Sequence, residues 1–242
     1  MRGVSFGTEA ARYDATRPGY PPVFLDRLMA DNPRDVLDVG CGTGLAARLF
    51  VERGCNVLGV EPDPRMADFA RETGVAVETS KFEDWDTRER TFDLVVCAQA
   101  WWWLDRDVAM AKVIHVLPRG KRLGILWNAG AGDDDVTKAL ADAYNRMGGV
   151  REPMLPGGFS PPVQADLEAD DRFRDVEFAR CEWERRYSRD EWIMAAGTFS
   201  DVIALEPERR DRLFEGIRSI LDENGGFRDV KIASSLVNAT HA

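Results

Sequence analysis

Apolar runs of strand length alternate with helix-like patterns through the first half of the chain. Short runs of mainly apolar residues predict strands at 36–39, 56–60, 75–78, 92–98 and 122–127. Between these runs, apolar residues recur at helical spacing over 45–51, 65–70 and 105–116. A shorter helical pattern at 24–29 precedes the first strand and ends at Asn32-Pro33. Strands that alternate with helices at this interval predict a parallel sheet with helices on both faces.

The pattern changes after residue 128. Alternation of apolar and polar residues predicts strands at 173–187 and 230–237, which we interpret as a pair that closes one edge of the sheet. Weaker helical patterns cover 133–147, 190–196 and 207–222. A loop rich in glycine and proline spans 148–165. We expect this loop and the helices between the last two strands to form a lid.

Three glycines at alternate positions directly follow the first strand, in the stretch Asp38-Val39-Gly40-Cys41-Gly42-Thr43-Gly44. Glycine has no Cβ, so its backbone can adopt positive φ and let a ligand approach the peptide closely. The start of the next helix offers unpaired N–H groups, which suit a carboxylate or phosphate. A dinucleotide fingerprint would need another glycine at Leu45, and no Gly-Lys-Ser/Thr run exists. The spacing alone leaves open that the stretch is only a tight turn.

Polar residues follow the other predicted strands as well. Glu61 ends the second strand, about 20 positions after the glycine loop, where a carboxylate can accept hydrogen bonds from both ribose hydroxyls of a nucleoside. Met66, in the following helix, is predicted either to cover an adenine ring or to pack in the core. Because the carboxyl ends of parallel strands meet at one edge of the sheet, we expect these loops to converge there.

Composition limits the classes of partner. The chain has 242 residues and a net charge of −10, which argues against nucleic acid or an anionic membrane as a partner. The four cysteines show no C-x-x-C pairing, so neither zinc nor any other metal is expected. The N-terminal residues lack the apolar core of a signal peptide, and no run is long enough to span a bilayer. We expect a cytoplasmic protein, monomeric or homodimeric.

Residues 36–128 resemble the core of the class I S-adenosylmethionine (SAM) dependent methyltransferases. Several motifs occur in the family's order: the glycine loop, Val60-Glu61-Pro62-Asp63, Phe82-Glu83-Asp84, Phe92–Val96, and Val116–Lys121. The head, Phe6 to Pro21, is similar to the start of the small-molecule methyltransferase subgroup, the type 11 methyltransferases, which includes trans-aconitate methyltransferase-like proteins. The resemblance implies an α/β, doubly wound, Rossmann-like sheet of seven mostly parallel strands, with an antiparallel C-terminal pair and a helical lid. We expect one domain: an N-terminal cap (1–35), the SAM-binding core (36–128), and the substrate lid with the closing strands (129–242).

The resemblance also assigns cofactor contacts, with SAM as the substrate and S-adenosylhomocysteine (SAH) as the product. Asp38 and the loop residues Gly40, Cys41, Gly42 and Gly44 would hold the methionine end of SAM. Glu61, with Pro62 and Met66 nearby, would bind the ribose side, and Asp84 with Glu83 would receive the adenine amino group. Ala98 and Gln99 would close the site beside the sulfonium.

The head supplies two further candidates. Tyr13 and Arg17 would fold over the cofactor, with Arg17 pairing with a carboxylate of the cofactor or the substrate. Simple packing of an N-terminal helix is the other interpretation of both residues. We name Tyr13 and Trp102 as catalytic candidates, and we expect the substrate to contact Trp101, Trp102, Trp103, Asn128 and Phe199.

One position departs from the family's pattern. Related proteins often have a histidine where this chain has Trp102, within Trp101-Trp102-Trp103. We expect at least one of these tryptophans to cap the substrate pocket and the others to pack against the lid; burial of all three in the core is the alternative. The missing histidine favours a small organic acceptor that needs no strong base, such as a carboxylate, although N- or C-methylation stays open.

Three other functions remain to be weighed. A protein that binds SAM or SAH without catalysis, as a regulatory or structural partner, would carry the same cofactor motifs. A nicotinamide oxidoreductase is disfavoured by Leu45 and by the lack of a Tyr-x-x-x-Lys motif. A nucleic-acid methyltransferase is disfavoured by the net charge of −10 and by the lack of an Asn/Asp-Pro-Pro-Tyr/Phe motif.

Overall fold

The computed structural model describes residues 10–147, 150 and 162–242, and the chain divides into two compact units. The first, which we call the sheet unit, comprises Gly19–Trp127, Pro161–Cys181 and Ser234–Ala242. The second, the helical unit, comprises Met1–Pro18, Asn128–Ser160 and Glu182–Ala233. Each unit is described by itself below. The division into a cap, a core and a lid within one domain stays a prediction.

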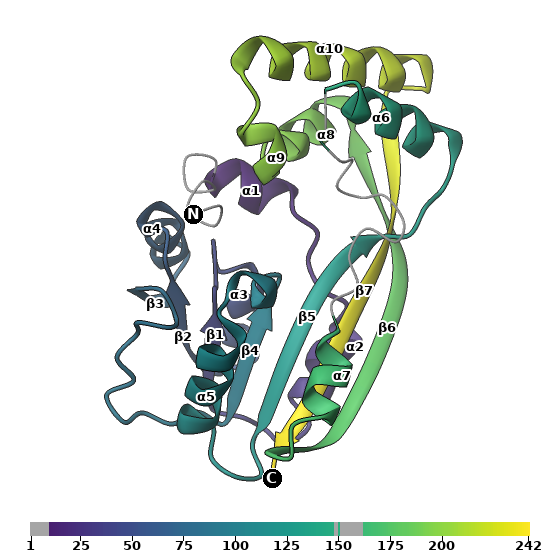
Figure 1. Cartoon of the computed structure of the whole chain (residues 1–242). Coiled ribbons are helices and arrows are strands. Elements are labelled where there is room, and N and C mark those ends of the chain that lie inside the picture. The colour runs from purple at the N-terminus through teal and green to yellow at the C-terminus, as the bar shows by residue number, and fades with distance from the viewer. Residues whose placement is uncertain (1–9, 148–149, 151–161) are drawn as a thin grey trace. The chain divides into compact units, whose positions relative to one another are not determined.

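A seven-stranded sheet has the order β3-β2-β1-β4-β5-β7-β6 (Figure 1). Its strands are β1 (Asp35–Val39), β2 (Asn56–Glu61), β3 (Ala76–Thr79), β4 (Leu94–Ala98), β5 (Arg122–Gly130), β6 (Phe173–Ser188) and β7 (Phe227–His241). The first five strands pair in parallel. β7 runs antiparallel to β5, because Lys121 pairs with His241 and Ala131 with Lys231. The predicted mostly parallel sheet, closed by an antiparallel C-terminal pair, is confirmed.

The described helices of the sheet unit cover both faces of its strands. They are α2 (Pro22–Leu28), α3 (Leu45–Val51), α4 (Pro64–Glu72), α5 (Arg106–Val116), α7 (Val163–Glu168) and the short 3₁₀ turn η3 (Trp101–Trp103). Successive β4 residues alternate between two cores, since Val95 packs with α5 and α7 while Val96 packs with α2, α3 and α4. A strand buried on both faces has to be apolar at every position. This explains why the parallel strands appear in the sequence as continuous apolar runs.

The helical unit has its own apolar core. Its described helices are α1 (Ala10–Thr16), α6 (Asp135–Asn145), α8 (Arg189–Ala196), α9 (Ser200–Ile203) and α10 (Pro207–Glu223). Tyr144, Trp192 and Ile217 are buried together in this core. The sequence pattern did not predict α9 or α7, because each is too short to display a helical period. Most of the predicted loop at 148–165 lies outside the described residues.

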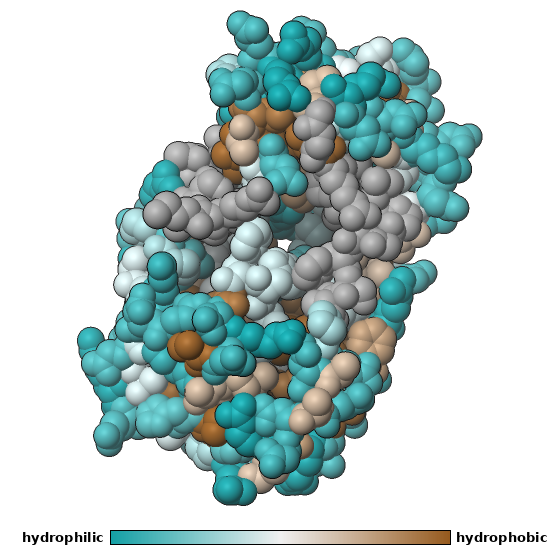
Figure 2. Space-filling model, viewed as in Figure 1, coloured by the Kyte–Doolittle hydropathy of each residue, from teal (hydrophilic) through white to brown (hydrophobic). Residues whose placement is uncertain are grey.

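The surface is predominantly hydrophilic where it can be seen. Figure 2 shows hydrophilic residues over much of the visible face, in keeping with the net charge of −10. Within the described ranges, no helix combines the length and the apolar character needed to cross a bilayer. Cys41, Cys55 and Cys97 are buried free thiols and Cys181 is a half-buried one. Buried thiols of this kind pack as small apolar side chains.

Candidate functional site

The glycine loop connects β1 to α3 at the carboxyl edge of the parallel strands. Gly40, Gly42 and Gly44 have φ values of 68°, 56° and 84°, in the region that favours glycine. The amide of Gly40 donates to the carbonyl of Val60, 2.8 Å away, so the loop lies against the end of β2. A Cβ on Gly40 would lie 2.5 Å from Cβ of Ala100, beyond β4. Gly40 is therefore required both by its φ and by this close approach.

Glu61 is bonded to the loop that the sequence associated with it. One carboxylate oxygen accepts a hydrogen bond from the amide of Gly42 and the other from the amide of Asp63, both at 2.9 Å. Burial raises the pKa of Glu61 to about 7, although the two amides act in the opposite direction. Each carboxylate oxygen has two acceptor positions, so one on each remains for a ribose hydroxyl.

Asp38 is the most unusual polar group in the site. Its side chain is 1% exposed, and within the described ranges neither carboxylate oxygen has a hydrogen-bond partner. Burial, followed by the negative charge of Glu61, raises its pKa to about 7, and the backbone amide of Ala47 opposes the shift. Burying a carboxylate without a hydrogen-bond partner costs free energy, so such groups occur where a ligand binds the carboxylate or a proton neutralises it. This geometry suits a cationic group such as an amine.

A third carboxylate, Asp63, belongs to the same cluster, and sequence reasoning gave it no role. It is fully buried, caps the start of α4 by accepting from the amide of Arg65, and forms an ion pair of 3.0 Å with the Arg65 guanidinium. Asp63 is thus neutralised by a neighbour while Asp38 is not. The signal in the sequence was an aspartate directly before a proline at the first helical position.

Cys41 and Met66 flank the glycine loop. Sγ of Cys41 fills the space over Gly59, where a Cβ would lie 2.4 Å away, so the side chain packs against β2. Met66 is 4% exposed, and its terminal methyl would lie 3.8 Å from a Cβ built on Gly42. Met66 is therefore buried and lies beside the loop. This position is compatible both with packing in the core and with covering an adenine ring.

The segment after β3 holds the pair predicted to receive adenine. Glu83 accepts a hydrogen bond of 2.8 Å from the amide of Asp105 through one carboxylate oxygen, which fastens it to the start of α5. Asp84 has an exposed side chain. Of the two carboxylates, Asp84 is the one directed to solvent.

The end of β4 brings together Ala98, Gln99 and the three tryptophans. Ala98 and Gln99 are half-buried, and Gln99 has a φ of 62°, which is uncommon for a residue other than glycine. Trp101 is buried in the core of the sheet unit, Trp102 packs partly against it, and Trp103 is 46% exposed. The alternative that all three tryptophans are core residues is therefore wrong. Their predicted roles beside the substrate stay predictions.

Comparison with known proteins agrees with this geometry. Residues 36–120 match the model of a methyltransferase domain family. An uncharacterized methyltransferase of Mycobacterium tuberculosis is 31% identical over 223 residues, covering 90% of this chain and 86% of the relative. The chain belongs to the SAM-dependent methyltransferases.

Two further similarities concern part of the sequence and the fold. A trans-aconitate 2-methyltransferase of Enterobacter sp. is 30% identical over 121 residues, covering 48% of this chain and 46% of the relative. The solved structure of a candidate type II methyltransferase from Anaeromyxobacter dehalogenans has a TM-score of 0.65 and 23% identity, and covers 93% of this chain and 97% of that one. The second similarity confirms the Rossmann-like methyltransferase fold.

The residues at the sheet edge fit SAM. The buried carboxylate of Asp38, which has no hydrogen-bond partner among the described residues, matches the cationic amino group, and Glu61 retains acceptor positions for ribose hydroxyls. Gly42 has no side chain of its own to separate a ligand from the backbone. Asp38, the glycine loop and Glu61 are contributed by adjacent strands β1 and β2. The strand ends pointed to the glycine loop and Glu61, and the resemblance to the methyltransferases added Asp38.

The remaining candidates lie in the helical unit of this methyltransferase. The Arg17 guanidinium lies 4.6 Å from the ring centroid of Tyr13 and 3.9 Å from that of Phe199, and it donates to the carbonyl of Thr198 at 3.1 Å. Asn128 donates to the carbonyl of Pro18 at 3.3 Å. The structure thus joins Tyr13 and Arg17 with Phe199, a grouping that no spacing in the sequence indicated.

Proposed function

We propose that this methyltransferase transfers the SAM methyl group to a small organic acceptor, with O-methylation of a carboxylate favoured and N- or C-methylation as the other options. The position of the two histidines supports an acceptor that needs no general base. Neither lies at the edge of the sheet that carries the glycine loop, Glu61 and Gln99.

The positions of both histidines follow from main-chain hydrogen bonds. His115 is exposed near the end of α5, whose last residue, Val116, accepts from the amide of Phe92 just before β4. His241 exchanges main-chain hydrogen bonds with Gly120 and Lys121, just before β5. It is half-buried rather than a fully exposed surface residue. Both histidines therefore lie at the edge where the parallel strands begin, opposite to the candidate site.

The chemistry is compatible with the absence of a histidine base. A lone pair of the acceptor oxygen forms the new O–C bond while the C–S bond breaks. The electron pair of the C–S bond goes to sulfur, which leaves as the neutral thioether of SAH. A carboxylate is already ionised at pH 7, so no proton has to be removed. Positioning and exclusion of water can then supply most of the acceleration.

The proposed roles of the residues differ between the two units. In the sheet unit, Asp38 and the glycine loop hold the methionine end of SAM, Glu61 with Pro62 holds the ribose, and Asp84 accepts from adenine. Ala98, Gln99 and the tryptophans contribute near the reacting end. In the helical unit, Tyr13 and Arg17 act on the cofactor or the acceptor, and Asn128 and Phe199 contact the acceptor. The Arg17 guanidinium, whose orientation is restricted by contacts with two aromatic rings, suits a carboxylate partner.

Two other observations support this class of acceptor. The Enterobacter relative is named for trans-aconitate, which carries carboxylates. The net charge of −10 disfavours nucleic acid and anionic membranes as substrates. No specific observation favours a SAM-binding protein without catalysis.

The proposal is tested with labelled SAM and a panel of small carboxylates, phenols and amines. We expect base-labile methyl esters to form from at least one carboxylate, with a rate that depends only weakly on pH between 7 and 9. Turnover restricted to phenols or amines, with an alkaline-limb pKa that is lost on substitution of one residue, would contradict it. Tight SAH binding without turnover of any acceptor would instead favour the non-catalytic alternative.

A further inference from the structure

The segment between β3 and β4 is anchored firmly at two places. Phe82 and Trp85 are 2% and 3% exposed, and their rings stack with centroids 6.0 Å apart. The indole N–H of Trp85 donates to Glu78 at 2.5 Å, and the same carboxylate receives two hydrogen bonds from Arg90, at 2.9 and 2.8 Å. These contacts hold the two aromatic residues, but they leave the exposed Asp84 between them.

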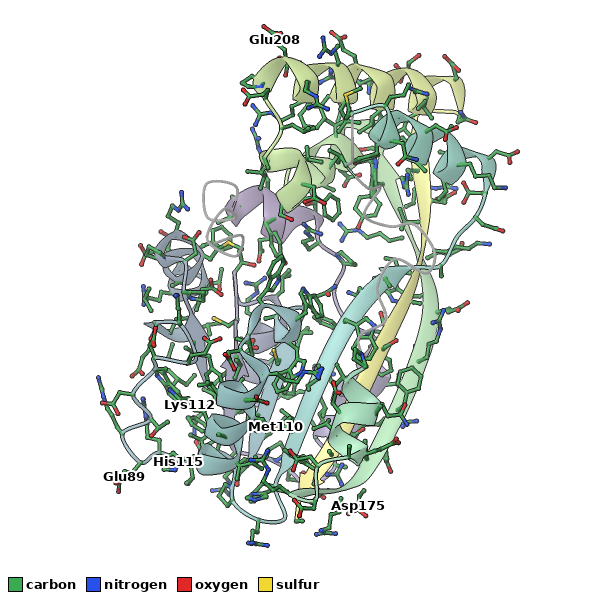
Figure 3. The ribbon with its side chains drawn as sticks, in the orientation of Figure 1. Glu89, Met110, Lys112, His115, Asp175 and Glu208 are labelled. Atoms are coloured by element: carbon green, nitrogen blue, oxygen red, sulfur yellow. The ribbon has the colours of Figure 1, made fainter. Side chains whose placement is uncertain are left out.

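Lys112 on α5 fastens the main chain on both sides of Asp84. Its ammonium nitrogen donates to the carbonyl oxygens of Glu83 and Trp85, each 2.7 Å away, and lies 5.9 Å from the ring centroid of Phe82. Figure 3 labels Lys112 on the helix that carries it. The amide of Asp84 donates to the carbonyl of Lys81 at 3.1 Å. The backbone of Asp84 is thus fixed by its own amide and by both neighbouring carbonyls.

The same helix holds the segment at a second point. Glu83 accepts from the amide of Asp105, the residue that caps α5, through its side chain, while its carbonyl is bonded to Lys112. Asp105 and Lys112 are seven positions apart, which corresponds to about 10 Å along a helix. One rigid helix therefore controls both the side chain of Glu83 and the carbonyls around Asp84.

We infer that Lys112 is a positioning residue that sets where the Asp84 carboxylate meets the adenine amino group. The inference rests on the proposed function in one respect: it takes Asp84 as the acceptor for that amino group. In this role Lys112 acts through the carbonyls of Glu83 and Trp85, to which its ammonium group is bonded. By binding the carbonyls on both sides of Asp84, Lys112 fixes the conformation of the main chain there. Removal of the ammonium group would leave both carbonyls without this charged donor.

The distinguishing measurement is selectivity for the base. The probes are SAH and its inosine analogue, S-inosylhomocysteine, in which an oxygen replaces the adenine amino group. We expect the wild-type protein to bind SAH about tenfold more tightly than the analogue, the effect of one well-placed hydrogen bond. In Lys112→Met, which retains the apolar stem and removes the ammonium group, we expect the ratio to fall to about twofold.

Three control variants separate positioning from general stability. Lys121→Met removes an ammonium group that forms a 2.7 Å ion pair with Asp93 at the opposite edge of the sheet, and it should keep the wild-type ratio. Lys112→Arg should restore most of the ratio, because a guanidinium can also donate to two carbonyls. Asp84→Ala should bind SAH and the inosine analogue with similar affinity.

Each outcome decides one point. An unchanged ratio in Lys112→Met, with wild-type selectivity present, would overturn the role of Lys112 alone. Failure of wild-type protein to distinguish the two probes would overturn the assignment of adenine to Asp84, and the inference with it. Failure of wild-type protein to bind SAH at all would overturn the proposed cofactor site itself.

Discussion

The glycine loop of the sheet unit and the Arg17 group of the helical unit are built in different ways. In the sheet unit, the positions of Glu61 and Gly40 are set by main-chain hydrogen bonds at the ends of adjacent strands. In the helical unit, Arg17 is held mainly through side-chain contacts with Tyr13 and Phe199, which are far apart in the sequence. The proposed cofactor site would therefore depend mainly on the backbone, whereas the Arg17 group is a side-chain arrangement that substitution can adjust.

The largest effect should come from Gly40→Ala. The new Cβ would meet Ala100 at 2.5 Å with φ at 68°, so strain and overpacking together should cost about 3 kcal/mol or more of stability. We expect SAH binding, measured by calorimetry, to become undetectable at 25 °C. Gly54→Ala is the matched control. Gly54 has φ at 84°, but among the described residues other than its chain neighbours no heavy atom lies within 4 Å of the new Cβ. This variant should lose only about 1–2 kcal/mol and bind SAH normally. Equal behaviour of the two variants would contradict a backbone-built site.

The next largest effect should come from Asp38→Asn, which removes the negative charge of Asp38 with little change in the size of the side chain. Asp38→Asn should weaken SAH binding by about 1.5–3 kcal/mol, the range for a hydrogen bond to a charged group. The same variant should unfold at a higher temperature than the wild-type protein at pH 8 without ligand, because a buried ionised carboxylate is removed. At pH 3, where Asp38 is largely protonated in both the folded and the unfolded chain, the two should differ little. Loss of stability at pH 8 would show that Asp38 is paired in the ligand-free protein.

A smaller effect is expected from pH. Burial raises the pKa values of Asp38 and Glu61 to about 7, while in the unfolded chain both ionise near pH 4. The folded protein therefore holds protons that the unfolded chain has lost, so the free energy of unfolding contributed by these groups falls as pH rises from about 4 to about 7.

The sign reverses for ligand binding. A bound ammonium group favours ionised carboxylates, so SAH should bind with proton release and about tenfold more tightly at pH 8 than at pH 6. Calorimetry in two buffers of different ionisation enthalpy measures the protons directly. Proton uptake, or affinity independent of pH, would be inconsistent with these shifted carboxylates.

The smallest effect should come from the helical unit. Phe199→Leu removes one of the two rings that contact Arg17, a cation–π interaction worth about 0.5–1 kcal/mol at an accessible position. We expect KM for the acceptor to rise about two- to fivefold while the dissociation constant of SAH is unchanged. Steady-state kinetics and calorimetry on the same preparation test this. A change confined to SAH binding would assign Arg17 to the cofactor instead.

The sequence predicted the parts that depend on strand ends. Glu61 and the three glycines were identifiable because a buried parallel strand is a continuous apolar run, and the residue after it must lie at the sheet edge. The contacts of Glu83, Lys112 and Arg17 could not be identified from the sequence. Each of them joins residues that are distant in the chain and that only the fold brings together. Asp63 was missed for another reason: an aspartate directly before a proline indicates a helix cap, but nothing in the sequence indicates that the residue is buried and paired with Arg65.

The central claim is that the glycine loop and Glu61 together form the SAM site. Its most direct test is calorimetric titration of SAH and NAD into wild-type protein and Glu61→Ala, with Glu72→Ala, an exposed carboxylate at the end of α4, as the control. We predict micromolar binding of SAH, no binding of NAD, a loss of about 1–3 kcal/mol in Glu61→Ala, and no change in Glu72→Ala. Unchanged SAH affinity in a folded Glu61→Ala variant would contradict the account.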